Sequence, residues 1–272
     1  MSKIIQMLVG FFIIIQNLYS QNLVINGSFE DYKYCPGELM PKELFSPDGW
    51  EKITGMSTPD YYNSCAIDIN YSVPINHMGN ISAYKGNGYI GIIPFNLEGY
   101  MEHVVGKLDT TLIKGKTYNI SFYYLIPNYR VRYFSSKLEV YISDVKPRLG
   151  VLPYYNTNDM GQFKAQITNP ETNILKDSAW TKFEGKYIAI GGEKYITIGI
   201  FYDNSSDLAN EIDEVEKYFM KKGKTKDIKY YQKWAVKNEG FIKSKDFGEE
   251  DYPYYLIDNV CVELIKEGYV PE

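Results

Sequence analysis

Hydrophobic and polar residues alternate with a period of two along much of the middle of the chain. In the stretch KTYNISFYYLI, Tyr118, Ile120 and Phe122 share one parity, and Asn119 and Ser121 share the other. Two later stretches repeat this pattern: SKLEVYISD and EKYITIGIFYD. The period predicts half-buried β-strands, because successive side chains of a strand point to opposite faces of its sheet.

Turn signals separate these stretches. Gly115, Pro147 and the pair Gly191-Gly192 each interrupt the alternation, and no helical pattern lies between one alternating stretch and the next. Many short strands divided by turns are typical of antiparallel sheets packed face to face. The sequence therefore predicts an all-β fold, an antiparallel β-sandwich of the jelly-roll type.

One charged segment, residues 206–248, departs from the strand pattern. In its first half Ile212, Val215 and Phe219 fall at helical spacing, and a second set of apolar residues follows Gly223. This spacing predicts a short helical insertion of two amphipathic helices before the last strand. Two roles are open for the insertion: a solvent-exposed flap, or an arm that docks onto another protein.

The first 20 residues have the proportions of a secretory signal peptide. Lys3 precedes an apolar stretch that ends at Ile15, and a polar exit follows up to Ser20. Because the apolar stretch is shorter than the roughly 20 residues of a membrane span, we expect cleavage after Ser20. The large Leu18 near that point leaves an uncleaved anchor as the alternative. We predict that residues 21–272 form one exported domain, secreted, periplasmic or at the cell surface, with no stable membrane span.

The three cysteines fit an oxidising compartment. Cys35 and Cys65 lie in a stretch rich in loop residues, and Cys261 lies in an apolar run near the end of the chain. Two loop cysteines in an exported protein are candidates for a disulfide, so we predict that Cys35 and Cys65 are joined. Three buried free thiols are the alternative. Cys261 is expected to be a small core residue.

Composition narrows the class of partner. The chain contains 27 tyrosines and has a formal net charge of −5. Tyrosine combines an apolar body with a polar tip, which suits half-buried sheet surfaces and surfaces that contact sugars or proteins. An acidic chain is poorly suited to nucleic acid, so nucleic-acid binding is excluded as a function.

The sequence shows none of the common catalytic motifs. It has only two histidines and lacks the H-E-x-x-H, G-x-S-x-G and P-loop patterns. Carboxylate pairs for glycoside hydrolysis have no sequence signature, and Glu98, Glu102 and Glu139 are the candidates to check in a structure. We predict that the protein is not an enzyme.

Several motifs together resemble the carbohydrate-binding modules of the galactose-binding-like jelly-roll type. They occur in this order: NLVINGSFE, GW at 49–50, GKTYNISFYY, WTKFEGKYIAIGGEKYITIGIF and YYLIDNVCV. The closer resemblance is to such modules in secreted and surface bacterial proteins. It covers nearly all of residues 21–272 except the charged insertion.

The resemblance implies a structural calcium ion. Carried over to this chain, its ligands are the carboxylates of Glu30 and Asp258, with backbone carbonyls near Asn26 and Lys85. Calcium accepts carboxylate and main-chain oxygens, so such a site can join the two ends of a domain. At Asn259 the chain departs from the second acidic residue of the family. The alternative is that Glu30 and Asp258 only accept backbone N–H bonds.

The resemblance also implies a glycan ligand, because sugar rings stack on aromatic faces while polar groups bind their hydroxyls. The side chains opposite the predicted core face are expected to form the binding surface, with loop aromatics at one end. The predicted ligand-binding residues are Trp50, Tyr62, Asn119, Tyr123, Glu139 and Tyr141. The alternative is a tyrosine-rich outer face that the insertion covers.

These inferences lead to a ranked set of functions. We expect a secreted, non-catalytic module that binds a glycan or polysaccharide at the cell surface. The alternative is a structural, adhesion or secretion-associated scaffold that docks a protein partner through the helical insertion. A glycoside hydrolase with a jelly-roll fold ranks third.

Overall fold

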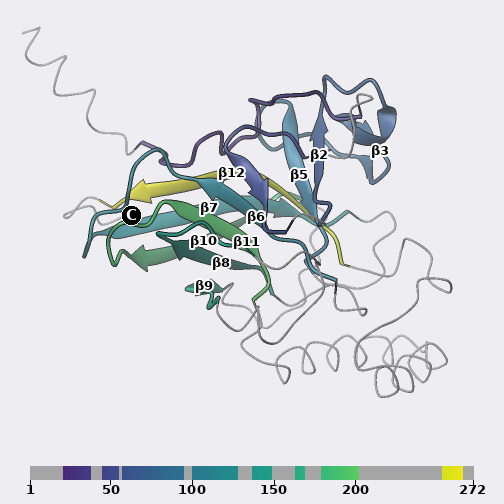
Figure 1. Ribbon diagram of the computed structural model, residues 1–272. Helices are drawn as coiled ribbons and strands as arrows, with labels where there is room; N and C mark the ends of the chain where they lie inside the picture. The colour runs from purple at the N-terminus through teal and green to yellow at the C-terminus, as the bar shows by residue number, and fades with distance from the viewer. Residues whose placement is uncertain are drawn as a thin grey trace, which may run out of the picture.

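The computed structural model describes residues 21–37, 45–54, 57–94, 100–127, 137–148, 163–168, 179–201 and 253–265, and these residues are almost entirely β-strand and loop (Figure 1). Their one helix is the short 3-10 helix η1 (Ile69–Tyr71). The strands are β1 (Trp50–Lys52), β2 (Asp60–Asn63), β3 (Ile75–Asn76), β4 (Gly79–Asn80), β5 (Gly88–Ile92), β6 (Val104–Lys107), β7 (Thr117–Leu125), β8 (Glu139–Ser143), β9 (Ile167–Thr168), β10 (Thr181–Ile188), β11 (Tyr195–Gly199) and β12 (Tyr255–Leu264).

Two five-stranded antiparallel sheets form the body of the protein. The first sheet has the order β1-β6-β11-β8-β9, and the second has the order β10-β7-β12-β5-β2. The remaining strands, β3 and β4, pair with each other. Every strand pair in these sheets is antiparallel. The predicted all-β antiparallel sandwich is confirmed.

One hydrophobic core fills the space between the two sheets. Ile120 and Phe122 of β7 are fully buried there, together with Val140 of β8 and Ile198 of β11. The parity that the sequence assigns to the core is therefore the parity that faces inward. Burying such a side chain stabilises the fold by about 1.5–3 kcal/mol.

The first described segment of the chain lies beside the last strand. The backbone N–H of Leu23 donates to the carbonyl of Val262 at 2.9 Å, and that of Val260 donates to Gly27 at 2.7 Å. On its other side the segment reaches the first sheet, where the Ile25 N–H donates to Lys107 at 3.0 Å. Residues 22–27 thus connect β12 of the second sheet with β6 of the first.

A smaller core covers part of the outer face of the second sheet. Tyr62, Tyr89 and Leu256 are buried in it beneath residues of the 73–83 region. Close to this core, Cys35 and Cys65 form a disulfide with their Cα atoms 5.9 Å apart. The predicted disulfide is confirmed.

Two predicted segments, the signal peptide at 1–20 and the helical insertion at 206–248, lie outside the described residues. Within the described ranges, no helix has the length and apolar character needed to cross a bilayer.

Candidate functional site

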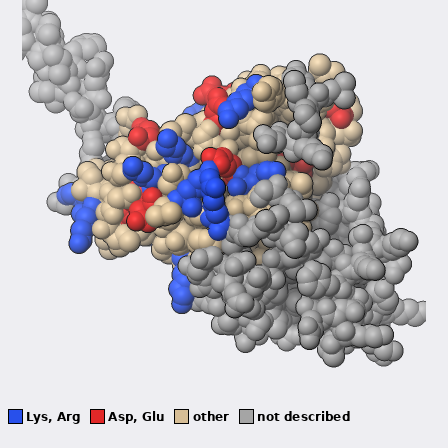
Figure 2. All heavy atoms as spheres, viewed as in Figure 1, with Lys and Arg blue, Asp and Glu red and all other residues tan. Residues whose placement is uncertain are grey.

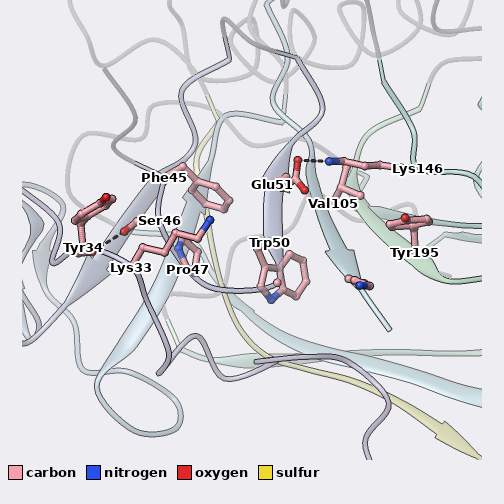
Figure 3. Close-up of a pocket in the computed structure, with 12 residues that line it drawn as sticks. Lys33, Tyr34, Phe45, Ser46, Pro47, Trp50, Glu51, Val105, Lys146 and Tyr195 are labelled. Carbon is pink, nitrogen blue, oxygen red and sulfur yellow. Dashed lines mark hydrogen bonds and ion pairs between the residues drawn. The ribbon is translucent and has the colours of Figure 1, made fainter. Parts of the chain in front are cut away.

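A groove lies beside the outer face of the first sheet, between β6, β11 and the loop segments 33–34 and 45–49 (Figure 3). Its volume is about 320 Å³. In Figure 3, Lys33, Tyr34 and Phe45 lie on one side, and Lys146 and Tyr195 lie on the other. The groove therefore combines aromatic rings with charged groups.

The loop wall of the groove is a pair of hydrogen-bonded segments. Tyr32 and Pro47 form an isolated β-bridge. The Lys33 N–H donates to the Ser46 carbonyl at 3.1 Å, and the Ser46 hydroxyl donates to the Tyr34 carbonyl at 2.6 Å. The disulfide between Cys35 and Cys65 fixes the end of the wall to the chain just after β2.

Asn26 holds the two wall segments together. Its amide Nδ2 donates to the carbonyls of Asp31, at 2.7 Å, and Asp48, at 2.9 Å. Its Oδ1 accepts the N–H of Asp31 at 3.0 Å. Asn26 has a φ of +52°, a left-handed conformation that asparagine adopts more readily than most residues. The sequence Asn26-Gly27 therefore sets the position of the wall.

The floor of the groove follows from the strand register. Lys107 of β6 lies opposite Tyr195 of β11, which lies opposite Ser143 of β8. Side chains directly opposite each other in an antiparallel pair share one face of the sheet, so these three form a row. At the neighbouring edge, Lys146 forms an ion pair with Glu51 of β1.

The face that carries this row also holds buried polar atoms that lack hydrogen-bond partners. Within the described residues these are Nδ1 of His103 and the hydroxyls of Ser143 and Thr197. Burial lowers the pKa of His103 to about 4, so its ring is neutral. Its Nε2–H donates to the Ile200 carbonyl at 2.7 Å, and Nδ1 is left as an unpaired acceptor. Unpaired buried polar atoms are rare in folded proteins.

The predicted ligand-binding residues do not form one surface. Tyr141 lies on the same face as the groove floor, and its ring contacts Phe163, with centroids 5.5 Å apart. Glu139 is on this face too, but it is 5% exposed, and its carboxylate accepts bonds from the Thr168 hydroxyl and the Phe201 N–H. Trp50 is buried in the core between the sheets and also contributes to the lining of the groove.

The Trp50 side chain is nevertheless important for the groove wall. It is 4% exposed, packs on Phe29 with ring centroids 4.9 Å apart and covers Gly106. Its indole Nε1–H donates to the carbonyl of Asn26 at 3.1 Å. Trp50 therefore supports the residue that positions the wall.

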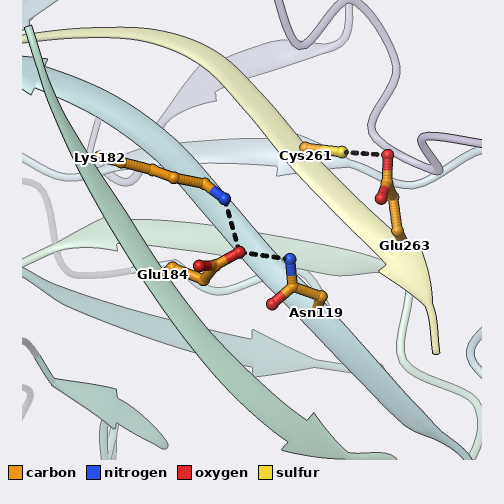
Figure 4. Close-up of polar contacts among 5 residues, drawn as sticks. All are labelled: Asn119, Lys182, Glu184, Cys261 and Glu263. Atoms are coloured by element: carbon orange, nitrogen blue, oxygen red, sulfur yellow. Dashed lines mark hydrogen bonds and ion pairs between the residues drawn. The ribbon is translucent and has the colours of Figure 1, made fainter. Parts of the chain in front are cut away.

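Asn119 and Tyr123 lie on the outer face of the second sheet, on the other side of the sandwich. Asn119 donates to Glu184 at 2.8 Å, and Lys182 donates to the same carboxylate oxygen at 2.6 Å (Figure 4). Lys182 first, and then Asn119, lower the pKa of Glu184. Tyr123 stacks on Tyr84 at a centroid distance of 3.5 Å.

Tyr62 lies neither at the groove nor on the exposed outer face of the second sheet. It is fully buried in the smaller core, and its hydroxyl bonds to that of Tyr254 at 2.8 Å. Cys261 also differs from the prediction of a core residue. It is half-buried on the outer face of β12, where its thiol donates to Glu263 at 3.2 Å (Figure 4). Burial raises the pKa of the Cys261 thiol to about 12, so it is protonated at neutral pH.

Two of the residues predicted as calcium ligands, Glu30 and Asp258, hold the turn at residues 84–88. The Lys85 N–H donates to Asp258 at 2.9 Å, and the N–H groups of Asn87 and Gly88 donate to Glu30 at 2.8 and 3.0 Å. Asp258 is fully buried, and this burial raises its pKa to about 7.

This donor set fits calcium through two carboxylates and a turn. A carboxylate has about four lone-pair positions, so the N–H bonds to Glu30 and Asp258 leave both able to accept a cation. Within the described part of the chain no group of three or more His, Cys, Asp or Glu side chains is suited to a metal. Backbone oxygens, such as the predicted carbonyl of Lys85, would have to complete the site.

Asn26 does not fit as a calcium ligand. Its carbonyl oxygen accepts the Phe29 N–H at 3.1 Å and the indole N–H of Trp50 at 3.1 Å. These two bonds use both of its lone pairs. The structure therefore gives Asn26 a part in the groove wall.

Two of the carboxylates considered for glycoside hydrolysis are enclosed. Glu102 is 1% exposed and accepts bonds from the Tyr100 hydroxyl at 2.6 Å and the Ile93 N–H at 2.7 Å. Burial raises its pKa to about 7. Glu139 is buried in the same way, and Glu98 lies outside the described residues.

Of the residues that line the groove, only Trp50 was predicted from the sequence as ligand-binding, and the others were missed. Lys107 and Tyr195 lie on strands, and Tyr195 was part of a recognised alternation, but the pairing that brings them together joins strands about 90 residues apart. Lys33, Tyr34 and Phe45 lie in loop segments without a periodic pattern. The one feature of the sequence that points to these residues is the nearby Cys35, whose predicted disulfide holds the loop in place.

Solved structures similar to this chain include three adhesin domains of Lys-gingipain and several carbohydrate-binding modules. The K1 cleaved adhesin domain of Lys-gingipain from Porphyromonas gingivalis W83 has 15% identity and a TM-score of 0.39, over 90% of this chain and 99% of that chain. The CBM22-1 xylan-binding domain from Paenibacillus barcinonensis Xyn10C has 11% identity and a TM-score of 0.38, over 92% and 99%. TmCBM61, solved with β-1,4-galactotriose, has 9% identity and a TM-score of 0.35, over 90% and 100%.

No family model matches the chain, and no curated protein sequence matches it. The low TM-scores describe a distant likeness, which gives no information about the residues of the site. The similar structures include carbohydrate-binding modules, the class of domain that the sequence motifs resemble.

Proposed function

We propose that this protein is an exported, non-catalytic glycan-binding module whose ligand lies in the groove beside the first sheet. The observation that carries the proposal is the combination of Tyr34, Phe45 and Tyr195 with charged side chains around one cavity. Sugar rings stack their C–H faces on aromatic rings, and their hydroxyls need polar partners at the rim. The volume of about 320 Å³ falls within the ~300–1,000 Å³ of ordinary small-ligand sites.

The construction of the wall supports this function. Binding sites gain affinity when their walls are rigid before the ligand arrives, because less conformational entropy is lost on binding. Here a disulfide, a β-bridge and the side chain of Asn26 fix the loop segments beside the sheet. A disulfide also suits the oxidising surroundings of a protein at the cell surface.

Binding to an array of plant, bacterial and host polysaccharides tests the proposal. Tyr195→Ala removes the ring from the groove floor and is expected to weaken binding about fivefold, since stacked aromatic contacts contribute about 1 kcal/mol each. Tyr123→Ala is the matched control, because the same change is made on the opposite side of the sandwich. Melting curves establish that both variants fold.

Loss of binding in Tyr123→Ala with normal binding in Tyr195→Ala would move the site to the second sheet. The absence of binding to every glycan would overturn the proposal. The scaffold alternative depends on residues 206–248, which lie outside the described part of the chain.

We further propose that the 84–88 turn, with Glu30 and Asp258, holds a structural calcium ion. The support is the convergence of a carboxylate from the first described segment and a buried carboxylate from β12 on one turn. Calcium would supply the positive charge that offsets the cost of burying Asp258. It would also join the two ends of the domain, so its removal is expected to lower the stability of the folded state.

A further inference from the structure

Basic side chains dominate the groove although the chain as a whole is acidic. Lys33, Lys107 and Lys146 line the cavity, and Glu51 is the one carboxylate among the lining residues. The whole chain has a formal net charge of −5. Figure 2, viewed from the side of the first sheet, shows blue side chains gathered over the middle of the described surface with few red ones among them.

Two of these lysines have no acidic partner in the part of the chain that the structure describes. Lys146 is paired with Glu51, whereas neither Lys33 nor Lys107 forms an ion pair with a described residue. Both are exposed, so their ammonium groups remain available to a ligand.

The position of Lys107 links its charge to the aromatic floor. Lys107 lies directly opposite Tyr195 in the β6–β11 pairing. Opposite residues in an antiparallel pair have Cβ atoms about 5 Å apart. A sugar ring stacked on Tyr195 therefore has an ammonium group within reach of its ring substituents. Lys33 stands next to Tyr34 on the facing wall, so the groove has an aromatic ring and a lysine on each side.

We infer that the groove selects acidic glycans, whose sugar rings carry carboxylate or sulfate groups. The inference rests on the proposed glycan-binding function and names its ligand class. An anionic substituent accepts charge-assisted hydrogen bonds from an ammonium group, and these bonds are roughly twice as strong as neutral ones. A neutral sugar would leave two exposed lysines without such partners.

A matched pair of polymers tests the inference. Polygalacturonate carries a carboxylate on each ring, and the same polymer after reduction of its carboxyl groups is neutral with an unchanged backbone. Dextran sulfate and dextran form a second pair for sulfate. Isothermal titration at low salt is expected to show about tenfold or tighter binding of one charged polymer over its neutral partner. This preference should shrink as salt is raised, because salt screens exposed charges.

Variants locate the selectivity. The double variant Lys33→Gln/Lys107→Gln should abolish the preference for charge and retain stacking on Tyr195. Lys186→Gln removes one positive charge from the exposed face of β10 in the second sheet and is expected to keep the preference. A Lys182→Gln/Lys186→Gln variant matches the double charge change on the exposed face of β10, in the second sheet.

Two outcomes would overturn the inference, and they differ from failure of the proposed function. If neutral and charged polymers bind equally well, and Tyr195→Ala weakens both, the groove is a glycan site without charge selection. If charge preference survives in Lys33→Gln/Lys107→Gln, the selectivity arises elsewhere. If none of the polymers and no glycan on the array binds, glycan binding itself fails.

Discussion

At the scale of single residues, Asn26 shows how a motif acquires its meaning from the fold. The resemblance placed calcium ligands at backbone carbonyls near Asn26, and in the structure the Asn26 carbonyl itself accepts the Trp50 indole N–H. The side chain then joins the Asp31 and Asp48 carbonyls of the groove wall. Asn suits this position because it combines a left-handed backbone with an amide that both donates and accepts.

Asn26→Ala is expected to lower the free energy of unfolding by about 2 kcal/mol, since it removes the wall bonds and places a Cβ residue at positive φ without a compensating amide. Asn26→Gly keeps the backbone conformation and removes the same bonds, so a smaller loss of about 1 kcal/mol is expected. Urea denaturation of both variants measures the difference. Unchanged midpoints in both would show that the side chain does not hold the wall.

At the scale of elements, alternation predicted the strands well. Strands β7, β8 and β11 lie within the alternating stretches of the sequence, because the parity of a strand is a local property. The pairing of strands is not local. Tyr123 and Tyr141 were expected on one surface, but β7 and β8 belong to different sheets, and their outward sides face away from each other. To predict the groove from the sequence, both the pairing of the strands and the path of the 33–49 loops would have to be known.

The wall element can be tested through its disulfide. Replacing Cys35 and Cys65 together by serine is expected to lower the free energy of unfolding by about 3 kcal/mol, because the bridge closes a loop of 30 residues. Glycan affinity should also fall as the wall loosens. Cys261→Ser is the control, since Cys261 forms no disulfide and its change should cost about 1 kcal/mol or less. A double variant with wild-type stability would contradict the assigned role.

At the scale of the whole molecule, the sequence predicted that the two ends of the domain meet. Leu23 and Gly27 bond to β12, and Glu30 and Asp258 hold the same turn. These contacts could be predicted because the resemblance pairs a motif near each end of the domain, and each of these motifs contains a carboxylate. The charged segment at 206–248 stays a prediction, since it lies outside the described residues.

Calcium binding at that junction is expected to raise the melting midpoint. An ion that binds only the folded form stabilises it by about 2.7 kcal/mol at a hundredfold excess over its dissociation constant. Melting curves of chelator-treated protein with and without added calcium measure the shift, and Glu30→Gln should remove most of it. Superimposable curves for the wild-type protein would refute the calcium site.

The central place of β12 has a consequence for when this protein can fold. This last described strand lies between β7 and β5, so a chain that ends before Tyr255 has neither strand paired on that side. During synthesis the second sheet therefore stays incomplete until β12 has left the ribosome. Until then β5 and β7 each present an unpaired edge, and such an edge can pair with a strand of another chain, so β12 also protects the sheet against aggregation.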